Sequence, residues 1–378
     1  MTDLITIPHP PFDSELLATI VEVERLRADI GSAMTTPRET FIELHRLFDT
    51  VMSVISARIE GNRTTVYEAV ETPHQGRRPG GGEQLREISN ITEAARFLDE
   101  LDTDQPLTHS LIRELHERIV RGLTREGDPT PGSYREVDVG IMDSTHVPPS
   151  WVTVHAEMTT LLDFANQDLP MHQQILQIAV AHHRFVWIHP FRNGNGRVSR
   201  LFTYAMLRRT IFARRGRSAL NPTSVFGNDR SAYMAALESA DSLTDDGLLE
   251  WAMFFASGIR DDLSRLIRLQ DHQFVANELV GPALERLRKD EVISTAEQQA
   301  LTIALEQGSV RAGELEAALP GAPSQRSRAI RSLLDRRLLT HADGPRSYRI
   351  VLASGPLAPR LIRQLDALGY LPRMLVDD

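Results

Sequence analysis

The 378-residue sequence contains no cysteine. This excludes disulfide bonds and thiolate metal sites, and it favours a reducing compartment, so we expect a cytoplasmic protein. No apolar run approaches the roughly 18 residues that a membrane span requires. Residues 1–11 also lack the basic and apolar segments of a secretory signal peptide. We therefore expect no association with a membrane.

Basic residues are fewer than acidic residues, 42 against 51, and the formal net charge is −9. This balance argues against binding nucleic acid over the whole surface, although it is compatible with a local basic patch. Hydrophobic residues make up 41% and charged residues 25%, as in an ordinary globular protein. The chain is long enough for two or three domains.

The densest group of chemically useful residues lies at 189–200, which read His-Pro-Phe-Arg-Asn-Gly-Asn-Gly-Arg-Val-Ser-Arg. Gly194 and Gly196 allow backbone N–H groups to turn toward an anion without a Cβ in the way. The segment that follows, to about residue 210, reads as a helix, so the loop opens onto a helix N-terminus, where negative charge is stabilised. This arrangement predicts a phosphate-binding loop.

Three further side chains add chemistry to this loop. Arg197 and Arg200 are one helical turn apart, and their planar guanidinium groups suit phosphate oxygens. His189 can accept a proton near neutral pH, which a passive anion site does not need. A tight turn before an ordinary helix, with a histidine in the core, would explain a few of these residues but not the whole string.

The string resembles the signature of the Fic family, His-x-Phe-x-(Asp/Glu)-Gly-Asn-Gly-Arg-x-x-Arg. The resemblance covers about residues 40–260 and implies a helical bundle that transfers AMP from ATP to a hydroxyl of a target protein. The implied partner is a protein with a Ser, Thr or Tyr hydroxyl, and the implied assembly is a homodimer. The resemblance also assigns roles: His189 as general base, Phe191 as an anchor in the core, Arg200 on the γ-phosphate, and four residues on the other phosphates, namely Gly194, Asn195, Gly196 and Arg197.

One position departs from the family pattern, because Asn193 stands where an acid usually holds Mg²⁺ (or Mn²⁺). An amide oxygen can bind a hard cation but brings no negative charge, so we expect weaker metal binding. Three outcomes remain open. The nucleotide can bring its own metal, the substrate can be another phosphate compound, or the enzyme can be slow or degenerate.

A second pattern resembles a feature of the same family. Ser56, Glu60, Gly61 and Asn62 match the inhibitory motif (Ser/Thr)-x-x-x-Glu-(Gly/Asn) at the end of a helix at about residues 44–62. The resemblance implies that Glu60 forms a charge-assisted, bidentate contact with Arg200 and blocks the γ-phosphate. A helix C-cap explains Gly61 and Asn62 equally well, and Glu60 can alternatively position a water that removes AMP from a modified target.

The remaining pattern is mainly helical. Residues 137–141 alternate between apolar and polar types and predict a short strand in a hairpin or flap between helices. Tyr233 matches a helix that borders the adenine pocket in the family, although ordinary helix packing explains it equally well. Helical spacing is expected over residues 14–30, 40–58, 90–100, 108–121, 154–166, 173–187, 233–240 and 248–269.

The pattern changes after residue 290. Three helices (294–307, 312–319 and 324–336) and two short strands within 338–351 resemble a winged helix-turn-helix. Residues 321–350 carry seven arginines against two aspartates, so this region is a candidate for DNA contact or, alternatively, for protein contact or dimerisation. The DNA-contact candidates are Arg326, Arg328 and Arg331.

The expected fold class is therefore mainly α: a Fic helical bundle with a short β-hairpin flap, followed by a C-terminal winged helix-turn-helix. The expected boundaries are 1–39 for an N-terminal arm and helix, 40–260 for the Fic domain, 261–290 for a linker helix, 291–352 for the winged helix and 353–378 for a tail. The main functional hypothesis is an autoinhibited protein adenylyltransferase. The alternative is a nucleotide-binding regulator that binds DNA through its winged helix.

Overall fold

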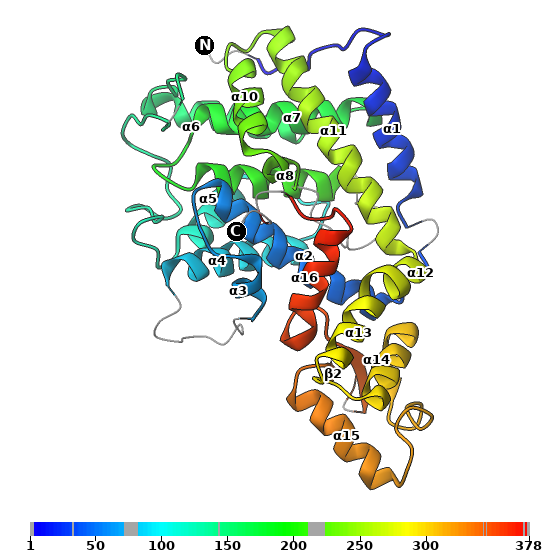
Figure 1. Cartoon of the computed structure of the whole chain (residues 1–378). Coiled ribbons are helices and arrows are strands. Elements are labelled where there is room, and N and C mark those ends of the chain that lie inside the picture. The colour runs from blue at the N-terminus through cyan, green and yellow to red at the C-terminus, as the bar shows by residue number, and fades with distance from the viewer. Residues whose placement is uncertain are drawn as a thin grey trace.

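The structure is a computed structural model, and it describes residues 4–31, 34–71, 82–142, 144–210, 224–342, 344, 346–372 and 375. A helical body built from the first two thirds of the chain is followed by a smaller module that contains the strands (Figure 1). No helix in these ranges has both the length and the apolar character of a membrane span.

Most helices of the body were predicted by the spacing of apolar residues. Thr108 caps one of them as expected, because its side chain accepts a hydrogen bond from the N–H of Leu111. The helices are α1 (Glu15–Asp29), α2 (Arg38–Ile59), α3 (Val66–Glu71), α4 (Glu83–Glu100), α5 (His109–Val120), α6 (Val154–Ala165), α7 (Met171–Ile188), α8 (Asn195–Thr210), α9 (Val225–Asn228), α10 (Arg230–Ala240) and α11 (Asp245–Gln270).

Helices α7 and α8 lie at the centre of the body, and they pack against each other while α6 and α11 pack on α7 (Figure 1). Nearly every residue between Ile175 and Phe185 is buried. A helix that is apolar on all sides is stable only when neighbours surround it. The loop between α7 and α8, which contains the start of the 189–200 motif, is consequently held at both ends by well-packed helices.

The second module begins after α11. Short helices α12 (His272–Phe274) and α13 (Gly281–Lys289) are joined by a π-helical turn, η2 (Val275–Val280), and are followed by α14 (Thr295–Gln307). Helix α14 matches the helix predicted at 294–307, and Ser294 and Glu297 form a reciprocal capping box at its start.

The strands of this module form one three-stranded antiparallel sheet in the order β1-β3-β2. The predicted pair is present as β2 (Leu339–His341) and β3 (Ser347–Ile350), with Leu339 opposite Ile350. An unpredicted strand, β1 (Val310–Arg311), pairs with the other edge of β3. Asp343 and Pro345 of the expected turn lie outside the described residues.

Helix α15 (Pro323–Asp335) matches the third predicted helix, but the second is wrong, because residues 312–318 form successive turns. Gly313 and Pro320 leave only a short segment between them, and a helix of that length is marginal even when its residues are good helix formers. The C-terminal segment contains α16 (Ala358–Ala367), whose buried Leu361, Ile362 and Leu365 pack it against α3 and α13.

The predicted patch of exposed arginines is smaller than the sequence indicated. Arg326 is buried and bound to Glu316 at 2.9 Å, so its assignment as a DNA contact is corrected. Arg336 is paired with Glu297 and Arg349 with Glu39, from outside the arginine-rich segment. The other two candidates, Arg328 and Arg331, are exposed on α15.

The predicted strand at residues 137–141 is also wrong, since these residues make no β-ladder with any described part of the chain. The side chain of Arg135 takes the place of a ladder. Its guanidinium donates to the carbonyls of Val137 and Pro149, on the two arms of the flap, and to the carbonyl of His189 at 2.9 Å. The flap (residues 135–149) is thus attached directly to the phosphate loop.

Candidate active site

The phosphate loop begins with a left-handed residue at the end of α7. His189 has φ 49° and ψ 61°, a conformation that is costly for a residue with a Cβ. Its N–H still donates to the carbonyl of Phe185, so the helix ends there and the chain reverses. The strain is held by the packed helices on either side, and it turns the imidazole out of α7 toward the loop.

The side chain of Asn195 closes the loop. Its Oδ1 accepts from the N–H of Phe191 at 2.8 Å, and its Nδ2 donates to the carbonyl of the same residue at 2.9 Å. Asn195 is buried and both ends of its amide are occupied. The sequence placed this residue on phosphate, and only its backbone N–H is in a position to serve that role.

Phe191 lies in the core below the loop, stacked on the imidazole of His116 with ring centroids 3.8 Å apart. Nδ1 of His116 accepts from the N–H of Gly132 at 3.0 Å, so Nε2 carries the proton and donates to the carbonyl of Asn193 at 3.2 Å. Burial lowers the pKa of His116 to about 4. A neutral histidine that the sequence analysis missed therefore supports the loop from below.

The two glycines of the loop are required for different reasons. Gly194 has φ 79°, and a Cβ there would also approach Cδ1 of Ile119 at 3.0 Å. Gly196 lies in the first turn of α8, and a Cβ there would overlap Oε1 of Glu60. Because the first N–H groups of a helix have no partners within the helix, this turn is an anion site, and the carboxylate of Glu60 lies over it.

His189 is suited to accept a proton. Its Nδ1 is 3.2 Å from the carbonyl of Val186, an arrangement in which Nδ1 carries the hydrogen and Nε2 keeps its lone pair. Burial lowers its pKa to about 4, against smaller raising effects from that hydrogen bond and from Glu60. The imidazole is therefore neutral at physiological pH.

Glu60 and Arg200 are joined across 140 residues of sequence. Oε1 of Glu60 lies 2.7 Å from Nη2 of Arg200, and the arginine is almost fully buried. Burial would raise the pKa of Glu60, but Arg200 and Arg197 outweigh it, and the pKa stays below its ordinary value. The carboxylate is consequently charged and competes with any phosphate for the same guanidinium.

The contact is not the bidentate one that the sequence analysis predicted. A single carboxylate oxygen of Glu60 is engaged, and Ser56 accepts two further hydrogen bonds from Arg200. Nε of Arg200 donates to the Ser56 hydroxyl at 2.8 Å, and Nη2 donates to its carbonyl at 2.9 Å. Ser56 therefore orients Arg200 from the same helix face that presents Glu60.

The end of α2 is held by contacts with residues outside the motif. Nδ2 of Asn62 donates to Oε2 of Glu87 at 2.8 Å, and its Oδ1 accepts from the N–H of Thr64. Arg230, at the start of α10, donates to the carbonyl of Ile59 at 3.0 Å. Gly61 has φ 94°, which allows the chain to leave the helix sharply. The turn at the end of α2, residues 60–62, is thus fixed to the body on two sides.

Arg197 does not face the anion site directly. It is buried, with Nη1 2.8 Å from Oε1 of Glu87 and Nη2 3.1 Å from the carbonyl of Glu126. Glu87 therefore connects the turn at the end of α2, through Asn62, to Arg197. Its position in an ordinary helical pattern gave no sign of this role, since the contact spans 110 residues.

This connection leads to a stability prediction. Replacing Glu87 with glutamine leaves the buried guanidinium of Arg197 without its closest counter-charge, and loss of one member of a buried pair costs about 3–5 kcal/mol. We expect the free energy of unfolding in urea to fall by that amount. The matched control is Glu93→Gln, an exposed position on the same helix, which should change stability by less than about 0.5 kcal/mol. Equal stability of the two variants would show that the pair contributes nothing.

The side chain of Asn193 is engaged within the loop and beside an arginine. Oδ1 of Asn193 accepts from the N–H of Gly194 at 2.6 Å and lies 3.4 Å from Nη2 of Arg197. The nearby carboxylate of Asp128 already binds the backbone N–H groups of Arg192 and Asn193. A neutral oxygen facing an arginine is a poor ligand for a hard cation.

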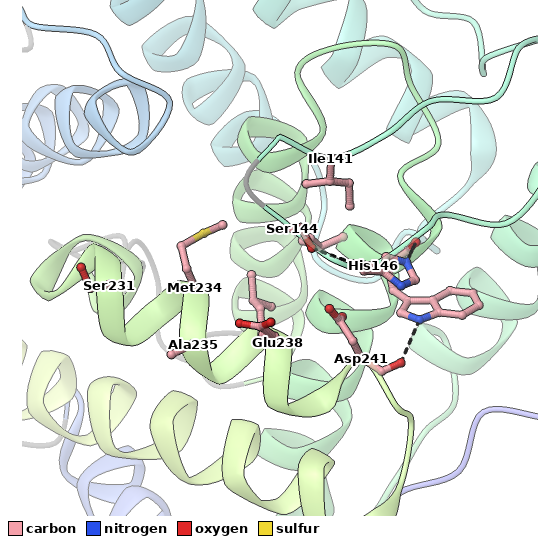
Figure 2. A pocket seen from close by; sticks show the side chains of 11 residues that line it. Ile141, Ser144, His146, Ser231, Met234, Ala235, Glu238 and Asp241 are labelled. Carbon is pink, nitrogen blue, oxygen red and sulfur yellow. Dashed lines mark hydrogen bonds between the residues drawn. The ribbon is translucent and has the colours of Figure 1, made fainter.

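A cavity of about 260 Å³ lies between the flap, the end of α7 and α10 (Figure 2). Its lining includes Ile141 and His146 of the flap, Trp187, and Met234 and Glu238 of α10. His146 is fixed there by a 2.9 Å contact from Nε2 to the carbonyl of Trp187. Trp187, which lines the cavity, lies two residues before His189, so the cavity adjoins the start of the phosphate loop.

Tyr233 does not line this cavity. Its hydroxyl lies beside Arg200 instead, so its contact with the nucleotide stays a prediction. Its ring is buried in an aromatic cluster, and its hydroxyl lies 3.0 Å from Nε2 of His182. Met234 and Glu238 line the cavity from α10, whereas Tyr233 lies on the buried side of that helix.

Comparison with known proteins agrees with this geometry. Residues 106–207 match the Fic/DOC family, so this part of the chain is a Fic/DOC family domain. The chain is 29% identical over 161 residues to the Protein adenylyltransferase Fic of Nematostella vectensis, covering 41% of this chain and 34% of that protein. It is 27% identical over 174 residues to the Protein adenylyltransferase fic-1 of Caenorhabditis elegans, covering 42% and 30%. The chain thus spans about a third of the length of these relatives.

Two solved structures share the fold. A Fic family protein from Desulfovibrio desulfuricans G20 aligns with a TM-score of 0.56 at 20% identity, over 92% of this chain and 98% of that one. Fic-1 from C. elegans aligns with a TM-score of 0.51 at 22% identity, over 67% and 72%. The first alignment extends well beyond the family domain and includes most of the second module.

Proposed function

We propose that this chain is a protein adenylyltransferase that transfers AMP from ATP to a hydroxyl of a target protein, and that Glu60 holds it inactive. The observation that carries the proposal is the Glu60 carboxylate, which lies over Gly196 and binds Arg200 opposite a neutral His189. A carboxylate in an anion site, beside a base, is what a phosphate-transfer site with an internal inhibitor requires.

The chemistry follows from the loop. Nε2 of His189 takes the proton from the target hydroxyl, whose oxygen attacks the α-phosphorus of ATP. A bond forms between that oxygen and the α-phosphorus, the bond to the β-phosphate oxygen breaks, and pyrophosphate leaves. The N–H groups of the first turn of α8 and the guanidinium of Arg200 stabilise the charge on the phosphates. No step depends on a metal held by Asn193.

The cavity behind the flap is the proposed place for the nucleoside part of ATP. Its wall combines the ring of Trp187 with the hydrophobic Ile141 and Met234, as pockets for planar ligands commonly do. The flap is proposed to receive the target chain, since its described residues make no ladder and since it exposes Met142 and Val147.

The direct test follows the label from ATP. Incubation of the Glu60→Gly variant with ATP labelled at the α-phosphate should label the variant itself or proteins in an extract, whereas ATP labelled at the γ-phosphate should label nothing. Labelling from the γ-position would identify a kinase instead. Absence of labelling from either position, with ATP still bound, would refute the proposal.

Position 193 provides a prediction for the metal. Asn193→Asp should place a negative charge within the loop and tighten Mg²⁺ binding to the ATP complex by at least about tenfold, because carboxylates are much better ligands for Mg²⁺ than amides. The readout is titration of Mg²⁺ into ATP-loaded protein in the Glu60→Gly background. ATP affinity without metal should not improve, because the added charge repels phosphate. Unchanged Mg²⁺ affinity would show that residue 193 is remote from the metal.

A further inference from the structure

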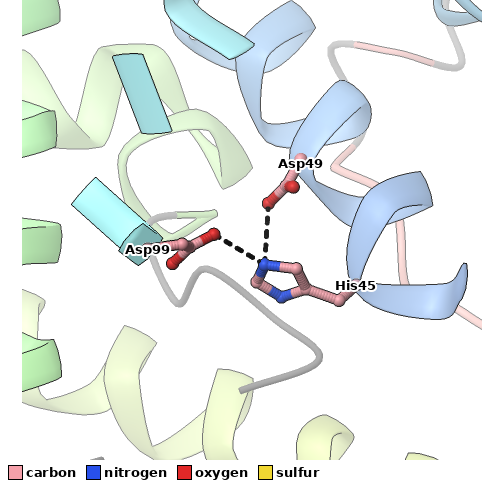
Figure 3. A group of neighbouring side chains, drawn as sticks. All are labelled: His45, Asp49 and Asp99. Carbon is pink, nitrogen blue, oxygen red and sulfur yellow. Dashed lines mark hydrogen bonds and ion pairs between the residues drawn. The ribbon is translucent and has the colours of Figure 1, made fainter. Parts of the chain in front are cut away.

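A second cluster of ligand-type side chains lies away from the phosphate loop. His45 and Asp49 occupy successive turns of α2, and Asp99 lies near the end of α4 (Figure 3). Nε2 of His45 is 2.8 Å from Oδ2 of Asp99 and 3.6 Å from Oδ1 of Asp49, and one nitrogen or oxygen from each residue lies within 4.8 Å of the others. The three side chains point toward one another.

The carboxylate of Asp49 makes no hydrogen bond to any residue that the structure describes, although its side chain is only 2% exposed. The nearest guanidinium, that of Arg96, is 4.0 Å away, beyond hydrogen-bond distance. Buried carboxylates normally have several donors, and one without them is costly. The carboxylate is aimed at His45 and Asp99, so the missing partner belongs between them.

Asp99 is held by neighbours that leave one oxygen facing the cluster. Its Oδ1 accepts from the hydroxyl of Tyr204 at 2.6 Å and lies 3.4 Å from Nε of Arg208. Oδ2 is the oxygen directed at His45. Hydrogen bonds to the outer oxygen of a carboxylate are the usual way in which a metal ligand is oriented.

We propose that His45, Asp49 and Asp99 bind one divalent transition-metal ion of the Zn²⁺ or Mn²⁺ type, at a site separate from the phosphate loop. Metal–ligand distances of about 2.0–2.2 Å place neighbouring ligand atoms roughly 3–3.5 Å apart, and the two distances from Nε2 bracket that range. An imidazole with two carboxylates selects transition metals over Mg²⁺ and Ca²⁺, which prefer oxygen alone.

The site has an access route and a mechanical consequence. Thr50 and Arg96, beside the cluster, line an open cleft of about 750 Å³ between the body and the sheet of the second module.

The ion would join α2 to α4 at a point about 11 residues before Glu60. At a rise of about 1.5 Å per residue this is roughly 16 Å along the helix. We therefore expect the metal to stabilise the folded protein.

The test uses the full chain, freed of metal by a chelator and kept without nucleotide. Isothermal titration with Zn²⁺, Mn²⁺ and Co²⁺ should find one equivalent bound by one of these ions, with an increase in the melting temperature. Asp49→Asn and His45→Gln should each weaken this binding at least tenfold and remove the increase. The matched control is Asp241→Asn, which alters a carboxylate that is paired with a histidine but has no second carboxylate, and it should bind like wild type.

The proposal is overturned if none of the three ions binds, or if binding persists in both variants of the cluster. A more stable Asp49→Asn protein, together with no uptake by wild type, would identify the cluster as a buried charge network without metal. Co²⁺ adds a spectroscopic check that does not depend on activity. Its visible absorption bands should appear with one equivalent in wild type and be absent in Asp49→Asn.

Discussion

Replacing Glu60 with glycine is expected to raise AMP transfer by about 10–100-fold. The change removes a charge-assisted hydrogen bond to Arg200, worth roughly 1.5–3 kcal/mol, and each 1.36 kcal/mol corresponds to a factor of ten. It also clears the first turn of α8, over which the carboxylate lies. Initial rates of labelling from ATP, with an excess of target or by self-modification, measure the effect.

Glu60→Gln is the matched control. It keeps the size of the side chain but removes the charge, so activation should be smaller than with glycine. Similar activation by both would show that charge alone blocks the site, and activation by glycine only would show that bulk does. If Glu60 instead positions a water for removal of AMP, Glu60→Gly should lose the ability to strip AMP from a modified target. Equal, undetectable transfer by wild type and glycine variant, with ATP bound by both, would contradict autoinhibition.

Replacing His189 with alanine in the Glu60→Gly background is expected to reduce transfer by about 10²–10⁴-fold, the usual contribution of a general base. ATP affinity should change little, because the proposed mechanism directs Nε2 of His189 at the target hydroxyl and assigns the phosphates to α8 and Arg200. Titration of ATP into the double variant separates these two quantities. Loss of binding equal to the loss of rate would show that His189 holds the nucleotide instead.

The pKa of His189 adds a pH dependence to this prediction. Its value is lowered to about 4, so the imidazole stays in its neutral, proton-accepting form as the pH falls from 8 to about 5. The base should become protonated, and activity should be lost, only as the pH falls through about 4. An imidazole NMR titration of the free protein measures this directly. A midpoint near the ordinary value of about 6.5 would show that burial does not govern this group.

The sequence predicted the phosphate loop because the residues that form it are contiguous. A glycine turn, a helix start and the arginines are local features, and helix geometry places them without knowledge of the rest of the chain. The pairing of Glu60 with Arg200 was predicted for a different reason, because a motif resemblance connected two distant segments. Its geometry was not predictable, since Ser56 takes donors that a bidentate contact would need.

The errors have a common cause. Alternating residues at 137–141 predict a strand only if another strand pairs with them, and in the fold Arg135 fills that place. Arg326 was counted as an available positive charge, because the sequence does not show that Glu316 pairs with it.

By itself, the sequence determined the helical class, the chemical character of the loop at 189–200 and the presence of an acid suited to block it. These properties depend on residue type and on spacing within one or two turns. Only the tertiary structure decided which charges are neutralised and which remain available. Arg197 is occupied by Glu87, Phe191 rests on a neutral His116, and Asp49 remains buried without a donor among the described residues. The physical reason is that burial and pairing are set by contacts between distant segments, which local spacing does not encode.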